Sequence, residues 1–236
     1  MYDITYLLNQ KNIMKDLTFP RLVSYPRTGS HWLRILMEKY TGIPSAVQSF
    51  FDNKPQKIWG FHIHDRIIGH WEPSEGPTME LKKVVYLYRN PVDTIYSQMK
   101  YHKDLPTGWD GSINENISQK VDDYIEEYHR HIRRWMFNNQ DISEILIIKY
   151  EDLVNKPSET FRQVLEFLNF EWNEQKFKEV YSFCDKQLTK KVTPHDENAL
   201  NIEELIDQNS AKKQKDNFKI LFCDKIRDRF SDVYNW

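Results

Sequence analysis

Residues 22–42 read LVSYPRTGSHWLRILMEKYTG, and three features in this stretch together predict a fold. A short apolar run comes first, a turn containing Pro, Gly and hydroxyl residues follows, and a helical pattern of apolar residues begins near Ser30. A strand, a tight turn and a helix in this order point backbone N–H groups and the helix dipole at an anion. The stretch therefore predicts an α/β unit with an anion site at the turn.

The side chains of this turn suit such a site. Gly29 would let the backbone approach a phosphate closely, Ser30 could cap the helix or bond an oxygen, and Arg27 would neutralise charge. The GxxxxGK[ST] motif of nucleoside triphosphatases is absent, because the turn has one glycine and no Lys followed by Ser or Thr. On these residues alone, a phosphate loop and an ordinary turn are both open.

Four further patterns indicate a sheet. Short buried strands are predicted at residues 21–25, 57–63, 83–88 and 144–150. Helical patterns separate most of these strands, which favours parallel pairing. We expect a single domain over residues 1–236, with a central parallel sheet of about four to five strands flanked by helices.

The predicted helices have recognisable starts. Asn90 is a plausible cap for a helix with Pro91 in its first turn, and Pro157 opens another helix. Apolar residues at steps of three and four predict a helix over 118–138, and a last one is predicted around 214–230. Residues 103–116 are rich in turn formers and long for a connection, so we expect a mobile loop over a site.

Composition excludes some partners. The net charge is -2, so no overall positive field would recruit nucleic acid or an anionic membrane, and any anion must be held by a local site. Two cysteines are too few for a disulfide framework, and no run approaches the roughly 18 apolar residues of a membrane-spanning helix. We expect a soluble, cytoplasmic protein with no nucleic-acid or membrane partner.

A second candidate site follows the strand at 83–88. Arg89 ends this strand, and Ser97 lies eight residues later on the next helix. Both side chains are expected near the carboxyl edge of the sheet, where open α/β folds bind ligands. An ion pair between Arg89 and Asp93 at the helix start is the alternative.

These segments resemble one family. SYPRTGSHWL resembles the 5′-phosphosulfate loop, YPKSGTTW, of the sulfotransferases that use 3′-phosphoadenosine 5′-phosphosulfate (PAPS). YRNPVDTIYS is similar to the 3′-phosphate motif of that family, with its arginine and serine at the same spacing. Residues 147–170 resemble its YEDL strand end and following helix. The resemblance covers residues 21–98 and 145–183, in the family's order.

The resemblance implies a P-loop-like, three-layer fold that binds PAPS as donor and releases the desulfated nucleotide PAP, without a metal. The residues that it places around the 5′-phosphosulfate are Arg27, Thr28, Gly29, Ser30 and His31. It places Arg89 and Ser97 on the 3′-phosphate, Trp32 against the adenine, and Tyr150 near the base.

The sequence departs from the family at three places. Arg27 replaces a lysine, and it keeps the charge but does not readily donate a proton to the leaving oxygen. His31 replaces a threonine, and its imidazole would donate to that oxygen or simply pack against the helix. No segment reads as RKGxxGDW; residues 188–201 lie where it is expected, and Lys190 or Lys191 could supply charge there.

The candidate base lies in WGFHIHDRIIGHW. On a strand, His62 and His64 would face the same side about 7 Å apart. In the resembling family a KTH segment supplies the base, so His64 would be the base and His62 would take the place of the lysine. The reaction needs such a group, because an acceptor hydroxyl attacks sulfur well only as its proton is removed.

Three other functions fit parts of the pattern. Some metal sites contain an HxH pair, so His62 and His64 also suggest a metal-dependent hydrolase. The position of Asp65 argues against a shared site, because its side chain should face away from both histidines. A kinase-like protein fits poorly without the Walker lysine and the metal-binding hydroxyl. An inactive nucleotide-binding relative also fits the changed loop.

The prediction is a sulfotransferase acting on a hydroxyl or amine of a small-molecule or carbohydrate acceptor. Its acceptor pocket is expected among loops 42–56, 65–80 and 103–116. Trp71 and Trp109 in these loops could stack on a sugar or a phenol ring, or could simply pack at the surface.

Overall fold

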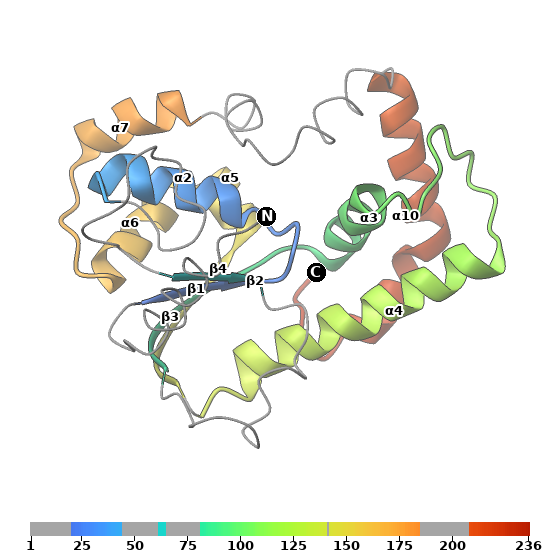
Figure 1. Ribbon diagram of the computed structural model, residues 1–236, viewed down its shortest axis with the longest axis horizontal. Helices are drawn as coiled ribbons and strands as arrows, with labels where there is room; N and C mark the ends of the chain where they lie inside the picture. Colours follow the sequence, from blue (N-terminus) through green and yellow to red (C-terminus); the bar gives the residue numbers. More distant parts are fainter. Residues whose placement is uncertain (1–19, 44–60, 65–80, 141, 185–207) are drawn as a thin grey trace, which may run out of the picture.

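The computed structural model describes residues 20–43, 61–64, 81–140, 142–184 and 208–236. They form a parallel sheet between two layers of helices (Figure 1). Its strands are β1 Arg21–Ser24, β2 Phe61–His64, β3 Leu81–Tyr88 and β4 Ile142–Lys149, in the order β2-β1-β3-β4. Every neighbouring pair is parallel, so the predicted α/β fold with a parallel sheet flanked by helices is confirmed.

The helices divide between the two faces of the sheet (Figure 1). One face carries α2 Ser30–Thr41, α5 Tyr150–Asn155, α6 Pro157–Phe167 and α7 Glu174–Phe183. The other carries α3 Pro91–Tyr101, α4 Glu115–Ile132, the π-helical η1 Arg133–Phe137 and α10 Gln208–Phe230.

The same short strands contribute to the core on each face of the sheet, because their side chains alternate in direction. Successive strand residues point to opposite faces, so Leu22 and Val85 join the core under α2 and α6, whereas Val23 and Val84 join the core that includes Trp135 of η1. All four strand residues are almost fully buried. This double burial explains why the strands read as continuous apolar runs rather than as alternating ones.

Most predicted elements are present, with shifted ends. Asn90 caps α3, its Oδ1 accepting from the backbone N–H groups of Val92 and Asp93 at 3.0 and 3.3 Å, and Pro91 is the first helical residue, as predicted. The helix predicted over 118–138 begins earlier because Asn114 caps it, accepting from Ile117 N at 2.9 Å. It also ends at Ile132, where η1 takes over.

Other boundaries were also wrong, and two helices had not been predicted. β4 ends at Lys149 and not at residue 150, because Tyr150 starts α5. α10 begins at Gln208 rather than near 214, and α5 and α7 had not been predicted. Residues 57–60 of the second predicted strand lie outside the described residues.

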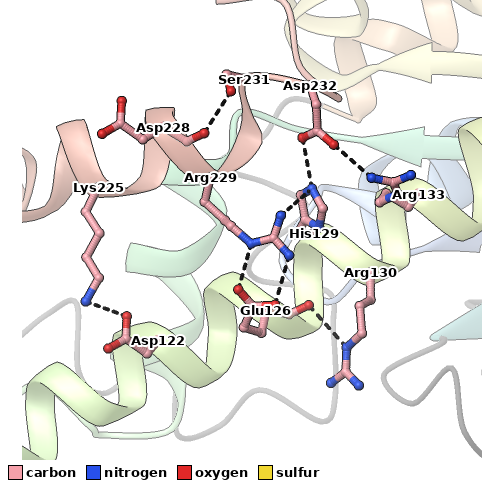
Figure 2. A network of polar contacts seen from close by, with 10 residues as sticks. All are labelled: Asp122, Glu126, His129, Arg130, Arg133, Lys225, Asp228, Arg229, Ser231 and Asp232. Atoms are coloured by element: carbon pink, nitrogen blue, oxygen red, sulfur yellow. Dashed lines mark hydrogen bonds and ion pairs between the residues drawn. The ribbon is translucent and has the colours of Figure 1, made fainter.

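Charge pairs connect α10 to α4 along one side of the helix (Figure 2). Lys225 pairs with Asp122 at 2.5 Å, and Arg229 pairs with Glu126 at 2.7 Å. Just beyond the helix, Asp232 accepts from Arg133 at 3.0 Å and contacts the buried His129 at 3.0 Å. Such exposed pairs contribute little each, and the larger contribution comes from four buried apolar residues of α10, Phe218, Phe222, Ile226 and Phe230.

The segment 103–116 packs against α10, which corrects two expectations. Trp109 is only 5% exposed, and its Nε1–H donates to Ser112 O at 2.7 Å. Gln214 donates to Pro106 O and Asn217 donates to Asp110 O, so α10 anchors the segment at two points. Trp109 is therefore a core residue, not a surface for an acceptor ring, and the segment is held in place rather than free. Trp71 lies outside the described residues.

No helix within the described ranges is long and apolar enough to cross a bilayer.

Candidate functional site

The site lies where the chain changes direction across the sheet. From β1 the chain goes to β2 on one side and then to β3 on the other, so the carboxyl ends of β1 and β3 flank a switch point. Open α/β sheets bind ligands at such points. The turn after β1 carries Arg27, and the turn after β3 carries Arg89.

The Arg27 turn has an unusual backbone. Arg27 and Gly29 both have positive φ, 68° and 96°, which is rare for a side chain as large as arginine. The hydroxyl of Thr28 is buried and donates to Tyr25 O at 2.7 Å. Gly29, and not Ser30, occupies the N-cap of α2, and no described side chain caps this helix.

The ring of Tyr150 explains why residue 29 is a glycine. A Cβ on Gly29 would lie 2.4 Å from Cδ2 and Cε2 of the Tyr150 ring, far inside contact distance. Tyr150 itself is 7% exposed and sits at the start of α5, directly after β4. The Arg27 turn therefore packs against Tyr150, the residue predicted to lie near the adenine base.

Arg27 connects the turn after β1 to the segment that carries Arg89 and Ser97. Its Nε donates to Ser97 Oγ at 3.2 Å, and its guanidinium lies 4.9 Å from the ring centroid of Tyr101. Arg89 in turn donates from Nη1 to Arg27 O at 3.1 Å. The structure thus brings together Arg27, Arg89 and Ser97, three residues predicted from two separate motifs.

Arg89 is held through its backbone, and one atom of its side chain, Nε, is left without a partner among the described residues. The buried hydroxyl of Tyr128 accepts from Arg89 N at 3.0 Å and donates to Arg89 O at 2.8 Å. The guanidinium stacks 4.7 Å from the Tyr150 ring centroid. Its Nε is buried and has no hydrogen-bond partner among the described residues. A buried charged donor without a partner is costly, and an anionic ligand would satisfy it.

Asp93 contacts α10 rather than Arg89. Lys215 Nζ lies 2.8 Å from Asp93 Oδ1, and Lys219 Nζ lies 4.0 Å from the same oxygen. Burial alone would raise the pKa of Asp93, but the hydrogen bond and charge of Lys215, together with the charges of Arg89 and Lys219, hold it below its ordinary value. The alternative of an Arg89–Asp93 ion pair is thus replaced by a pair with Lys215.

The other predicted donor residues lie on the first turn of α2. Ser30 is 3% exposed, and His31 is partly exposed. Trp32 is 8% exposed, its Nε1–H donates to Cys184 O at 2.8 Å, and its ring meets the Tyr150 ring edge to face at 6.3 Å. In this arrangement Trp32 belongs to the core between α2 and α7.

The two candidate bases are described by their backbone alone. His62 pairs with Leu22 and His64 pairs with Ser24, so His64 lies at the carboxyl end of β2, level with the end of β1. This register brings its backbone to the edge that carries the Arg27 turn. Lys190 and Lys191 lie outside the described residues.

Sequence reasoning missed Tyr101, Tyr128 and Lys215. Residues 89, 93, 97 and 101 are spaced by four, a signal that could have placed Tyr101 on the face that carries Ser97. Tyr128 and Lys215 come from distant helices, and no local pattern connects them to Arg89.

No three His, Cys, Asp or Glu side chains gather to form a metal site in the part of the chain that the structure describes.

The family model described as a sulfotransferase domain matches residues 73–235. The chain belongs to the sulfotransferase family. The match contains Arg89, Ser97 and Tyr150, whereas the Arg27 turn and the two histidines of β2 precede it.

Known sulfotransferases are similar to part of this chain. Human Sulfotransferase 6B1 is 28% identical over 174 residues, which cover 63% of this chain and 54% of that protein. Cytosolic sulfotransferase 13 of Arabidopsis thaliana is 23% identical over 198 residues, covering 72% of this chain and 59% of that protein. The chain thus spans little more than half the length of the curated relatives it matches.

Two solved structures share the fold. Mouse sulfotransferase SULT7A1 complexed with PAP has a TM-score of 0.58 at 17% identity, covering 91% of this chain and 88% of that one. Retinol dehydratase in complex with androsterone and inactive cofactor PAP has a TM-score of 0.51 at 15% identity, covering 98% and 87%. These likenesses confirm the sulfotransferase fold.

Proposed function

We propose that this protein transfers a sulfuryl group from PAPS to a hydroxyl or amine of an acceptor and releases PAP. The observation that carries the proposal is the buried Nε of Arg89, which has no partner among the described residues and lies beside the Arg27 turn. Membership of the sulfotransferase family and the PAP named in both structural neighbours support the same donor.

The proposed donor site uses both turns. The 5′-phosphosulfate would be held by residues of the first turn and helix start, Arg27, Thr28, Gly29, Ser30 and His31. Arg89 and Ser97 would hold the 3′-phosphate, because a guanidinium and a hydroxyl suit a dianionic group.

Trp32 and Tyr150 are proposed to contact the adenine base of the nucleotide. Tyr150 packs against Gly29 and under the Arg89 guanidinium, so it links the two phosphate positions. An aromatic ring offers a flat apolar face to a purine.

The transfer itself would be an in-line displacement at sulfur. The acceptor oxygen or nitrogen forms a bond to sulfur while the bond from sulfur to the bridging phosphate oxygen breaks. His64 would take the proton of the acceptor, and His62 would stand where the resembling family has a lysine. Arg27 would stabilise the charge on the leaving phosphate electrostatically, and His31 would donate to it.

We further propose a small-molecule or carbohydrate acceptor and a cytoplasmic location. The name of the Arabidopsis relative, a cytosolic sulfotransferase, supports the location.

The test is transfer from a radiolabelled sulfate donor to a panel of phenols, alkyl alcohols and oligosaccharides. We expect His64→Ala to lower transfer by roughly 10²- to 10⁴-fold and Arg27→Ala to weaken donor binding. Arg162→Ala, which removes an exposed arginine paired with Glu166 on α6, is the control and should change neither. The proposal fails if His64→Ala keeps full transfer while Arg27→Ala leaves donor binding unchanged.

A thermal-shift measurement separates the metal-dependent alternative. Ligands that bind only the folded state raise the unfolding temperature. PAP should stabilise a sulfotransferase, whereas zinc or manganese should stabilise a hydrolase that uses His62 and His64. Stabilisation by PAP with no transfer to any acceptor of the panel would favour an inactive nucleotide-binding relative.

A further inference from the structure

A carboxylate lies near the two residues proposed for the 3′-phosphate. Asp93 is four residues before Ser97 on α3, so these two are neighbours on one helix face, and its charge interacts with that of Arg89, which precedes the helix. Its pKa is held below the ordinary value, so it is ionised at neutral pH. An ionised carboxylate repels a phosphate, and at this position it would oppose donor binding unless cations compensate.

Helix α10 brings two cations to this carboxylate. Lys215 lies 2.8 Å and Lys219 4.0 Å from the same oxygen of Asp93. The charge of Arg89 also lowers the pKa of Asp93, so three cations act on this one carboxylate. A phosphate monoester carries close to two negative charges at neutral pH, and cations gathered at this place would attract it.

The position of Lys215 is set by packing rather than by its own flexible side chain. One residue earlier, Gln214 is buried and donates to Pro106 O. Phe218, three residues later, is fully buried and packs on the Tyr96 ring of α3 at 5.4 Å. The far end of α10 is tied to α4 through the pairs of Figure 2. The helix therefore presents Lys215 to α3 at a fixed place.

We propose that Lys215 is a nucleotide-binding residue of this sulfotransferase. When PAPS or PAP binds, its ammonium leaves Asp93 for the 3′-phosphate held by Arg89 and Ser97. Lys219 remains beside Asp93 and keeps that carboxylate neutralised. This inference rests on the proposed donor site and adds α10, a helix far away in sequence, to it.

The experiment compares two nucleotides by calorimetry. PAP carries a 3′-phosphate, and adenosine 5′-monophosphate does not. Lys215→Met should weaken PAP binding about tenfold, the effect of one charged hydrogen bond, and should leave adenosine 5′-monophosphate binding unchanged. Lys215→Arg, which keeps the charge, should retain most of the affinity for PAP.

Lys225→Met is the matched control, because Lys225, later on the same helix, forms an equivalent pair with Asp122 of α4. It should change the affinity for neither nucleotide. Lys215→Gln repeats the test with a polar side chain if the methionine variant folds poorly.

Three results would overturn the inference. Unchanged PAP affinity in both Lys215→Met and Lys215→Gln would remove Lys215 from the site. Equal loss for both nucleotides would indicate a structural role for the helix. Full recovery of PAP affinity in a Lys215→Met, Asp93→Asn double variant would mean that Lys215 only neutralises Asp93. If the unaltered protein binds no PAP, the proposed function itself fails, and the inference falls with it.

Discussion

Gly29→Ala probes the contact that holds the candidate site together. The substitution has two costs, a positive φ of 96° that L-residues rarely adopt and a Cβ placed 2.4 Å from the Tyr150 ring. Backbone strain of this kind costs about 1.5 kcal/mol, and overpacking a buried ring costs about 2 kcal/mol. The expected loss in the free energy of unfolding is therefore about 3.5 kcal/mol, or roughly 10 °C in Tm for a chain of this size.

Gly42→Ala is the matched control. Gly42 also has positive φ, 69°, but an added Cβ would meet nothing within 4 Å. It should lose only the strain, about 1.5 kcal/mol or roughly 4 °C. Because the Tyr150 ring also lies under Arg89, Gly29→Ala should weaken PAP binding, whereas Gly42→Ala should not.

Denaturant unfolding of the two variants, and of Gly29→Ala in a Tyr150→Leu background, separates the two costs. Removing the ring should leave only the strain, so the alanine should cost about 1.5 kcal/mol there. The reasoning is refuted if Gly29→Ala costs no more than Gly42→Ala, or if its cost is the same with and without the Tyr150 ring.

Three further predictions concern neighbouring groups. Tyr128→Phe removes the hydroxyl that serves both Arg89 N and Arg89 O, and it should cost about 1–3 kcal/mol in denaturant unfolding and weaken PAP binding; unchanged affinity would contradict this role. Burial raises the pKa of the Cys184 thiol to about 11, so iodoacetamide should modify Cys223 well before Cys184. Mass spectrometry of the labelled protein gives the order, and the reverse order would contradict the structure. The pKa of Asp93 is lowered in the folded state, so the ionised carboxylate stabilises the fold above its unfolded-state pKa, and this stabilisation is lost as the pH falls through the folded-state pKa. Between about pH 6 and about pH 2 the parent protein should therefore lose more stability than Asp93→Asn. Parallel stability curves for the two proteins would be inconsistent with the lowered pKa.

Local patterns were sufficient for the sheet and for the main site motifs. The apolar runs, the Asn90–Pro91 helix start and the order of the elements predicted parallel strands, whose carboxyl ends meet at one edge. Arg89 and Ser97 were therefore expected near this edge. The hydrogen bonds from Arg89 to Arg27 and from Arg27 to Ser97 bring the Arg27 turn to the same place.

The details that the sequence did not reveal depend on contacts between distant segments. Gly29 was expected to admit a phosphate, yet its missing Cβ also makes room for Tyr150, which no local pattern shows. The left-handed backbone of Arg27, which accompanies its contact with Ser97, is uncommon for arginine and so was not predictable from residue type.

Helix α10 accounts for most of the remaining differences. It buries Trp109, which the sequence placed in an acceptor loop, and it supplies Lys215 to Asp93. Both contacts follow from the way α10 packs on α3 and α4. Tertiary packing of this kind is not encoded in the spacing of neighbouring residues.

The most direct test of the central claim is calorimetric binding of PAP and of adenosine 5′-monophosphate to the unaltered protein and to Arg89→Gln. The unaltered protein should bind PAP at least about tenfold more tightly than the monophosphate, because Arg89 has a buried Nε free among the described residues to meet the 3′-phosphate. Arg89→Gln should remove this preference, and Arg162→Gln, at an exposed position of α6, should keep it. An unaltered protein that binds no PAP, or that binds both nucleotides equally, would contradict the account.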